Sequence, residues 1–257
     1  MSWRLIKAEL LKLRRRRGLL AWTLLIPLGV VGLQYGVLAA LHAGDPAAHG
    51  PAGGVANLAT TLVLLGTLAP VAAVLVGATA GAGDVEAGLF RDLVVTGRSR
   101  RALFAARVPG GLALLLPVVA AAWLLAVGAS FAFAGGSATP GLGAVLLGGG
   151  WALLAAALAY VVALGLASLS GSRAMTVGVM LAWLFPVSNI LLSISQLGGW
   201  RRAIMQPALE RIAPSQLVPG GGGSAVTMSL AVALLVLALW SIVPLVAGAW
   251  RTQTRDA

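Results

Sequence analysis

The sequence predicts an all-α polytopic membrane protein with six transmembrane helices and an amphipathic helix at its N-terminus. Three observations support this fold class: the composition, the six long apolar runs, and the uneven distribution of basic residues. Hydrophobic residues make up 59% of the 257-residue chain, and charged residues make up only 10%, against about 25% in a soluble domain. So few charges cannot cover the outside of a soluble protein of this size, so most of the surface must face lipid.

Six apolar runs are long enough to cross a bilayer, which needs about 20 residues per helix. They occupy approximately residues 19–41, 55–80, 108–133, 142–168, 175–197 and 224–250. We therefore expect a single transmembrane domain over residues 1–257, with a loop at 81–107 and another at 198–223.

The first segment, residues 2–17, predicts an interfacial helix. Apolar residues recur there at helical spacing, and basic residues occupy the opposite side. The apolar positions are Trp3, Ile6, Leu10 and Leu13, and the basic ones are Arg4, Lys7, Arg14 and Arg15. The alternative is a basic segment without structure of its own, which only orients the first span.

The basic residues fix the expected orientation. Fifteen of the 18 lysines and arginines lie in the two terminal segments or in the connectors that share their side, and three lie in the segment 198–223. Basic residues concentrate on the cytoplasmic side of membrane proteins. We therefore expect both termini and the loop 81–107 in the cytoplasm of a cell with this protein in its inner (plasma) membrane.

Several classes of function are disfavoured. The chain has no cysteine and only two histidines, His42 and His49, both in one connector, so no catalytic set or metal motif can be assembled. Its two lysines, Lys7 and Lys12, belong to no phosphate-binding loop. No charged residue falls within a predicted span, as ion-coupled transport would need. Nucleic acid is not an expected partner, because no soluble basic module is present.

The segment Asp84–Arg107 carries eight of the chain's 25 charges. We expect Asp84 at the surface, capping a helix that continues through Glu86 and ends near Gly97. The apolar stripe of this helix is formed by Leu89, Phe90, Leu93 and Val94. Such a helix could dock on a partner or could lie on lipid headgroups, and residue chemistry favours neither.

The pattern "E-x-G…R-x-L…T-G-R-S-R" resembles the loop between spans two and three of ABC type-2 transporter permeases. Its residues are Glu86, Gly88, Arg91, Leu93, Thr96, Gly97, Arg98, Ser99 and Arg100. The basic N-terminal helix, the six-span layout and the segment "WRRAIMQPALERIAPSQLVPG" before the last span are similar to the same family, so the resemblance covers the whole chain.

The resemblance implies a permease subunit that works as a homodimer or heterodimer with two copies of a separate ABC ATPase. ATP and Mg²⁺ would bind to that partner, with no cofactor and no enzymatic activity in this chain. The implied ATPase contacts are Glu86, Gly88, Leu89, Phe90, Arg91, Leu93, Arg98, Arg100 and Arg101. The implied elbow helix, which lies against the ATPase and the membrane lipid, includes Trp3, Ile6, Lys7 and Leu10.

A hydrophobic or amphipathic cargo is expected, such as a drug, an antibiotic, a lipid or a peptide, because no span carries a charge. Six polar residues are candidates to line its pathway: Gln34, Tyr35, Asn57, Thr60, Thr61 and Asn189. Hydrogen bonds between helices are the more frequent role of such residues. The segment 198–223 is expected to cap the outer end of the pathway, with Ile204, Leu209 and Ile212 on the membrane, or to be an ordinary surface loop.

Two other classes of function stay open. One is a membrane protein that binds a peptide without transport, as immunity proteins do. The other, less favoured, is a membrane-embedded enzyme. An ATPase that copurifies with the chain would separate the permease from both.

Overall fold

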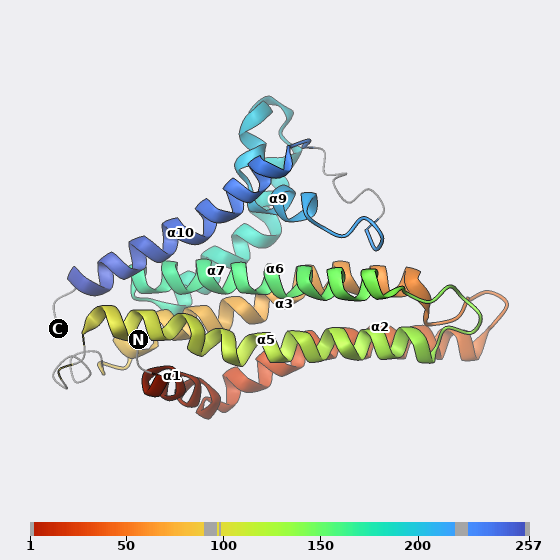
Figure 1. Ribbon diagram of the computed structural model, residues 1–257, viewed down its shortest axis with the longest axis horizontal. Helices are drawn as coiled ribbons and strands as arrows, with labels where there is room; N and C mark the ends of the chain where they lie inside the picture. Colours follow the sequence, from red (N-terminus) through yellow and green to blue (C-terminus); the bar gives the residue numbers. More distant parts are fainter. Residues whose placement is uncertain (1–2, 90–96, 98, 219–225, 255–257) are drawn as a thin grey trace.

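The computed structural model describes residues 3–89, 97, 99–218 and 226–254, and its regular structure over these residues is entirely helical. Figure 1 shows long helices side by side, with α1 (Trp3–Arg15) and the C-terminal end of α10 (Leu230–Thr254) at the same end of the bundle. We call the end of the bundle that carries α1 and the C-terminal end of α10 the basic end. The opposite end, formed by the connectors 45–53 and 133–141, is the distal end.

Six helices of the described chain are long and apolar enough to span a membrane, which confirms the number of spans expected from the sequence. The first four are α2 (Arg17–Gly44), α3 (Gly54–Glu86), α5 (Arg100–Ala132) and α6 (Leu142–Ser170). The fifth runs from Arg173 to Ser193, and the sixth is α10 (Leu230–Thr254). The protein is therefore a multi-pass membrane protein.

The loop at the basic end is shorter than its predicted bounds of 81–107. Helix α3 continues to Glu86 and α5 begins at Arg100, so only residues 87–99 connect them. The 33 residues of each helix give it a length of about 50 Å. Since hydrocarbon is only about 30 Å thick, both helices project well beyond it.

Glycines bring α3 and α6 into close contact. A Cβ atom on Gly77 would lie 2.6 Å from the Tyr160 carbonyl oxygen, and one on Gly81 would lie 2.6 Å from that of Leu164. Gly165 of α6 meets Pro244 of α10 in the same way. In lipid, where no hydrophobic force drives helices together, such close packing is a main source of association.

The fifth span is interrupted. It consists of α7 (Arg173–Ala182), the π-helical turn η1 (Trp183–Val187) and α8 (Ser188–Ser193). Pro186 lies in the π-helical turn, and a proline cannot donate the backbone hydrogen bond of a regular α-helix. The interruption of the fifth span thus has a local physical cause, which is the missing backbone donor of Pro186.

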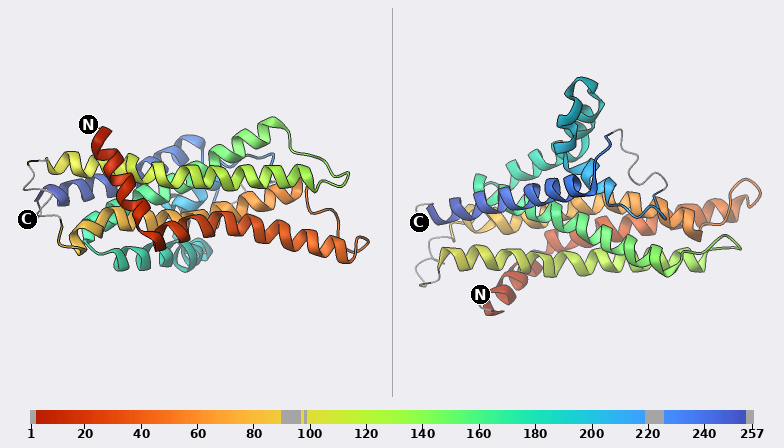
Figure 2. Two further views of the ribbon diagram at one scale, coloured as in Figure 1. Left: turned by 90° about the horizontal axis from the view of Figure 1, so that it is seen from below. Right: turned by 45° about the horizontal axis from the view of Figure 1, so that its top comes forward.

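The segment before the last span returns to the bundle. It contains the 3₁₀ segment η2 (Ser195–Ala203) and the helix α9 (Met205–Arg211). Met205, Ala208 and Leu209 pack against Ala155 of α6 and Ala233 of α10. Figure 2 shows the segment rising from the side of the bundle near its middle.

Two expectations for this segment are wrong. Ile204 and Leu209 are buried within the protein rather than resting on the membrane. The last helix begins at Leu230 rather than at 224. Since the Trp151 indole donates to the Leu209 carbonyl at 2.9 Å, the segment is bonded to α6 and is more than a surface loop.

Candidate functional site: a charge network at the basic end

The centre of the network is a buried ion pair between α3 and α5. The Arg107 guanidinium donates to the Asp84 carboxylate at 3.0 Å and to the Gly81 carbonyl at 3.1 Å. Both residues are at most 3% exposed. A buried charge is costly unless it is paired and hydrogen-bonded, so the two helix ends are held in one register.

Helix α1 (Trp3–Arg15) contributes the other two charges. The Lys12 ammonium bonds both Asp84 carboxylate oxygens at 3.0 Å and the Glu9 carboxylate at 2.6 Å. Burial raises the pKa of the Glu9 carboxyl above its ordinary value, against the opposing effect of Lys12. Two acids and two bases thus join α1 to α3 and α5.

Small residues allow this close approach. Gly110 of α5 lies under the Glu9 side chain, and a Cβ there would be 2.8 Å from the Glu9 Cβ and Cγ. Gly111 faces the ring of Tyr160 in α6, and the Tyr160 hydroxyl donates to the Arg107 carbonyl at 2.6 Å. The network therefore extends to α6 through a neutral hydrogen bond.

The end of α3 that precedes the connector 87–99 is bonded to α7. The Glu86 carboxylate accepts a bond from the Arg173 backbone amide at 2.6 Å and lies 4.0 Å from its guanidinium. Arg173 is the first residue of α7, where an acidic group is favoured by the helix dipole. Any displacement of Glu86 therefore reaches the fifth span.

The α5 side of the connector is anchored to α10. Ser99 caps α5 by accepting a bond from the Ala102 amide at 3.2 Å. Arg100 then donates to the Gln253 carbonyl at 3.0 Å, and Arg101 donates to the Gln253 side chain at 2.9 Å. Two adjacent arginines thus hold the last turn of the sixth span.

Several of the ATPase contacts predicted from the sequence lie in the connector 87–99. Gly88 and Gly97 have positive φ, at 69° and 77°, and Leu89 is 49% exposed. Phe90, Arg91, Leu93 and Arg98 lie outside the described residues, as do Val94 and Thr96.

The prediction for Asp84 is wrong. Asp84 does not cap a new helix at the surface but lies, buried, in the last turns of α3, which ends at Glu86. Helix α3 continues past the apolar run because Asp84, near its end, is bonded to Lys12 of α1 and to Arg107 of α5.

The predicted elbow residues divide between two faces of α1. Ile6 and Leu10 are half-buried toward the bundle, while Trp3 is 65% exposed. Lys7 lies 5.4 Å from the centre of the Trp3 ring, a cation–π contact. The one apolar face expected of an interfacial helix is therefore divided, because Ile6 and Leu10 pack toward the bundle while Trp3 remains exposed. Figure 2 shows α1 lying obliquely across the long helices.

Four of the six candidate pathway residues form one hydrogen-bonded group between α2 and α3. Gln34 donates to the Asn57 carbonyl at 3.1 Å, and Asn57 donates to three carbonyls at the start of α3. Thr61 lies 3.4 Å from the Tyr35 hydroxyl and both are buried. Thr60 bonds its own helix, and Asn189 lies apart on α8. The group has the geometry of a helix-to-helix contact.

Glu9, Lys12, Arg107 and Gln253 were not identified from the sequence as members of this site. Each lies near the edge of an apolar segment, where a charged or polar residue ordinarily contacts solvent. A weak signal was present: Asp84 and Arg107 are opposite charges at the adjoining ends of consecutive spans.

The arrangement joins the ends of α1, α3 and α5 through buried charges. The described residues contain no group of three or more His, Cys, Asp or Glu that could hold a metal. No family model matches the chain, and no curated protein matches it.

Proposed function

We propose that the protein is the membrane-spanning permease subunit of an ATP-driven exporter and that it couples to a separate ABC ATPase through residues 86–101. One observation carries the proposal. The connector 87–99 is flanked at both ends by residues that are bonded to helices distant in sequence. A protein bound there would act on α1, α3, α5, α7 and α10 together.

The proposal includes an orientation. With the basic end in the cytoplasm of a cell inner membrane, the network faces a soluble partner that binds ATP and Mg²⁺. Two ATPase copies and a second permease subunit would complete the transporter, as the resemblance to type-2 permeases implies. The excess of basic residues at this end supports the orientation.

The connector has the chemistry of a docking surface. Leu89 is exposed at the basic end beside Gly88, and Arg101 is exposed on the other side of the connector. An apolar side chain flanked by cations fits an apolar groove with an acidic rim. In the proposed complex Phe90, Arg91, Leu93 and Arg98 join the same contact.

Helix α1 has a matching role in this proposal. Its inner face is joined to Asp84 through Lys12, and its outer face carries Trp3, Lys7 and Arg4. It would therefore rest on headgroups and ATPase while remaining bonded to the coupling helices. A hydrophobic or amphipathic cargo fits this proposal, because the charged residues of the six helices lie near the basic end rather than in the middle of a span.

The test is copurification of the chain with the ATPase encoded in its neighbourhood, together with ATP-driven transport in vesicles. Leu89→Asp should reduce ATPase recovery and coupled transport at least about tenfold, because it places a charge in an apolar contact. Leu142→Asp, also at a highly exposed leucine but at the distal end, is the matched control.

Undiminished coupling in both Leu89→Asp and Phe90→Asp would refute the docking role. If no ATPase copurifies and the chain instead retains a peptide, the protein is a peptide-binding membrane protein without transport.

A further inference from the structure

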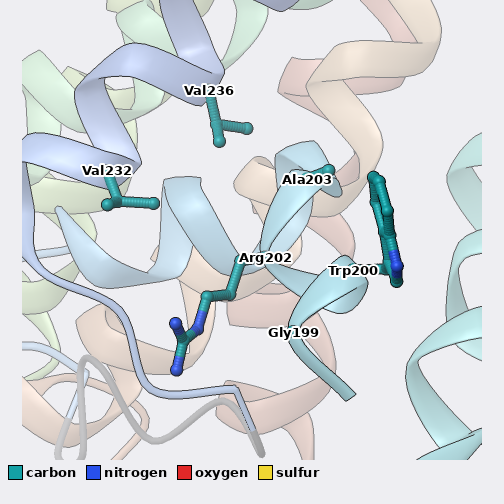
Figure 3. Close-up of a pocket in the computed structure, with 6 residues that line it drawn as sticks. All are labelled: Gly199, Trp200, Arg202, Ala203, Val232 and Val236. Atoms are coloured by element: carbon teal, nitrogen blue, oxygen red, sulfur yellow. The ribbon is translucent and has the colours of Figure 1, made fainter. Parts of the chain in front are cut away.

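A groove separate from the charge network lies between η2 and the beginning of α10. Its walls are Gly199, Trp200, Arg202, Ala203, Val232 and Val236, and its volume is about 420 Å³. Figure 3 shows the two valines on one side, Trp200 on the other, and the Arg202 side chain below them. The volume falls within the range of about 300–1,000 Å³ that is typical of ligand sites.

The lining combines apolar walls with one cation. Val232, Val236 and Ala203 offer aliphatic surface, and Trp200, which is 81% exposed, adds an aromatic face. Arg202 is the one charged residue of the lining. This composition fits an amphiphile with a hydrocarbon chain and an anionic head.

Arg202 is available for such a ligand, unlike its neighbours. Arg201 donates to the Gly198 and Leu192 carbonyls, and Arg211 donates to the Met228 carbonyl. Within the part of the chain that the structure describes, no hydrogen bond or ion pair of Arg202 is found. A guanidinium at an apolar groove gains most from a phosphate, which it can bind with two hydrogen bonds.

The position of the groove favours a bilayer lipid over a soluble anion. Val232 and Val236 belong to the first two turns of a candidate membrane span, and Leu234 and Leu235 beside them are more than half exposed. Tryptophan and arginine at the end of a span are typical of the membrane interface. A lipid already present in the bilayer would enter from the side.

A second copy of the chain fits the groove less well. In a two-fold dimer the same patch meets itself, so Arg202 of each copy would approach the other, close to Arg201 and Arg211. This charge distribution favours an anion and opposes self-association.

We infer that the groove between η2 and α10 binds one anionic phospholipid of the bilayer, with an acyl chain along Val232 and Val236 and the headgroup phosphate at Arg202. The groove shares no lining residue with the charge network at the basic end, so the inference does not depend on the proposed ATPase partner.

The test uses the absence of cysteine in the chain. A single fluorophore on Gly199→Cys reports the groove, since this glycine is exposed and a Cβ there meets no atom within 4 Å. The full chain is placed in phosphatidylcholine vesicles that contain a small fraction of brominated phosphatidylglycerol or brominated phosphatidylcholine. Bromine quenches the label only when that lipid occupies a site beside it.

The expected result is a preference of roughly tenfold for phosphatidylglycerol over phosphatidylcholine, because the choline cation of phosphatidylcholine offsets its phosphate charge and is repelled by Arg202, whereas phosphatidylglycerol keeps a net negative charge. Arg202→Gln should abolish the preference. Arg251→Gln is the matched control, because it removes an exposed charge from the opposite end of the same helix α10 and should leave the preference intact.

Three outcomes would overturn the inference. One is equal quenching by the two lipids in the otherwise native chain. Another is an equal loss of preference in Arg202→Gln and Arg251→Gln, which would show attraction to net charge alone. The third is disulfide formation between two Gly199→Cys chains without a lipid preference, which would place a second copy at the groove.

Discussion

Asp84 and Arg107 are the residues on which the basic end depends. Their charges are almost inaccessible to solvent, and each is bonded to the other and to at least one further group. A buried pair need not stabilise a fold more than apolar side chains would, but removal of one partner leaves an uncompensated charge. The pair therefore determines how α3 and α5 end relative to each other.

Asp84→Asn should lower the free energy of unfolding by about 3–5 kcal/mol, because it leaves Arg107 buried without a counter-ion. Denaturation in mild detergent, followed by tryptophan fluorescence, measures the loss. Glu86→Gln, at a partly exposed pair, should cost less than about 1 kcal/mol. The double variant Asp84→Asn with Arg107→Gln should recover part of the loss, and additive losses would contradict the pairing.

Glu9 makes the stability depend on pH. Burial raises its pKa in the folded protein above 4.5, the ordinary value. The folded state therefore holds the Glu9 proton more tightly than the unfolded state does. The stabilising contribution of Glu9 is fully present below about pH 4.5 and is lost as the pH rises through the pKa of Glu9 in the folded protein. The charges that face Glu9 are Lys12, Asp84 and Arg107.

Glu9→Gln should accordingly raise the unfolding temperature at pH 8, and the difference from the native chain should shrink as pH falls toward 4.5. Thermal denaturation in detergent across this pH range measures the difference. If Glu9→Gln is less stable than the native chain at pH 8, the bond to Lys12 outweighs the effect of burial.

At the scale of elements, the contact of α3 with α6 shows why glycine spacing alone is ambiguous. The pairs Gly32/Gly36 and Gly77/Gly81 have the same spacing, and the sequence offers no means to rank them. The second pair touches the α6 backbone, whereas a Cβ on either residue of the first pair meets no atom within 4 Å. Their surroundings therefore differ completely.

Gly77→Val should destabilise the protein by about 3 kcal/mol or more, because the new side chain would collide with the backbone of α6, which cannot move aside as a side chain can. Gly32→Val is the matched control, with the same change in size on an open face, and should stay within about 1 kcal/mol of the native chain. Denaturation in detergent compares them. Equal losses would show that side-chain type, rather than contact, decides the effect.

For the whole molecule, the orientation in the membrane can be tested directly because the chain has no cysteine. Ala87→Cys lies in the connector at the basic end and Ala47→Cys in the connector at the distal end, both at exposed positions. An impermeant maleimide should label Ala47→Cys in right-side-out vesicles and Ala87→Cys only in inside-out vesicles. The reverse pattern would exclude a cytoplasmic ATPase as partner.

The sequence by itself determined that this is a helical membrane protein with six spans. Long apolar runs can satisfy their backbone in lipid only as helices, and this constraint acts on each segment separately. The distribution of basic residues, from which its orientation is predicted, was equally visible in the sequence. Each of these features depends only on residues that lie close together in the sequence.

Only the tertiary structure decided that Asp84 is buried with Lys12 and Arg107, that Gly77 rather than Gly32 meets another helix, and that residues 205–211 pack against α6. Each of these facts concerns groups that lie more than 20 residues apart in the chain. An isolated segment carries the charge or the glycine but not the identity of its partner. That identity arises when the helices pack and the cost of leaving a charge unpaired or a void unfilled selects one arrangement.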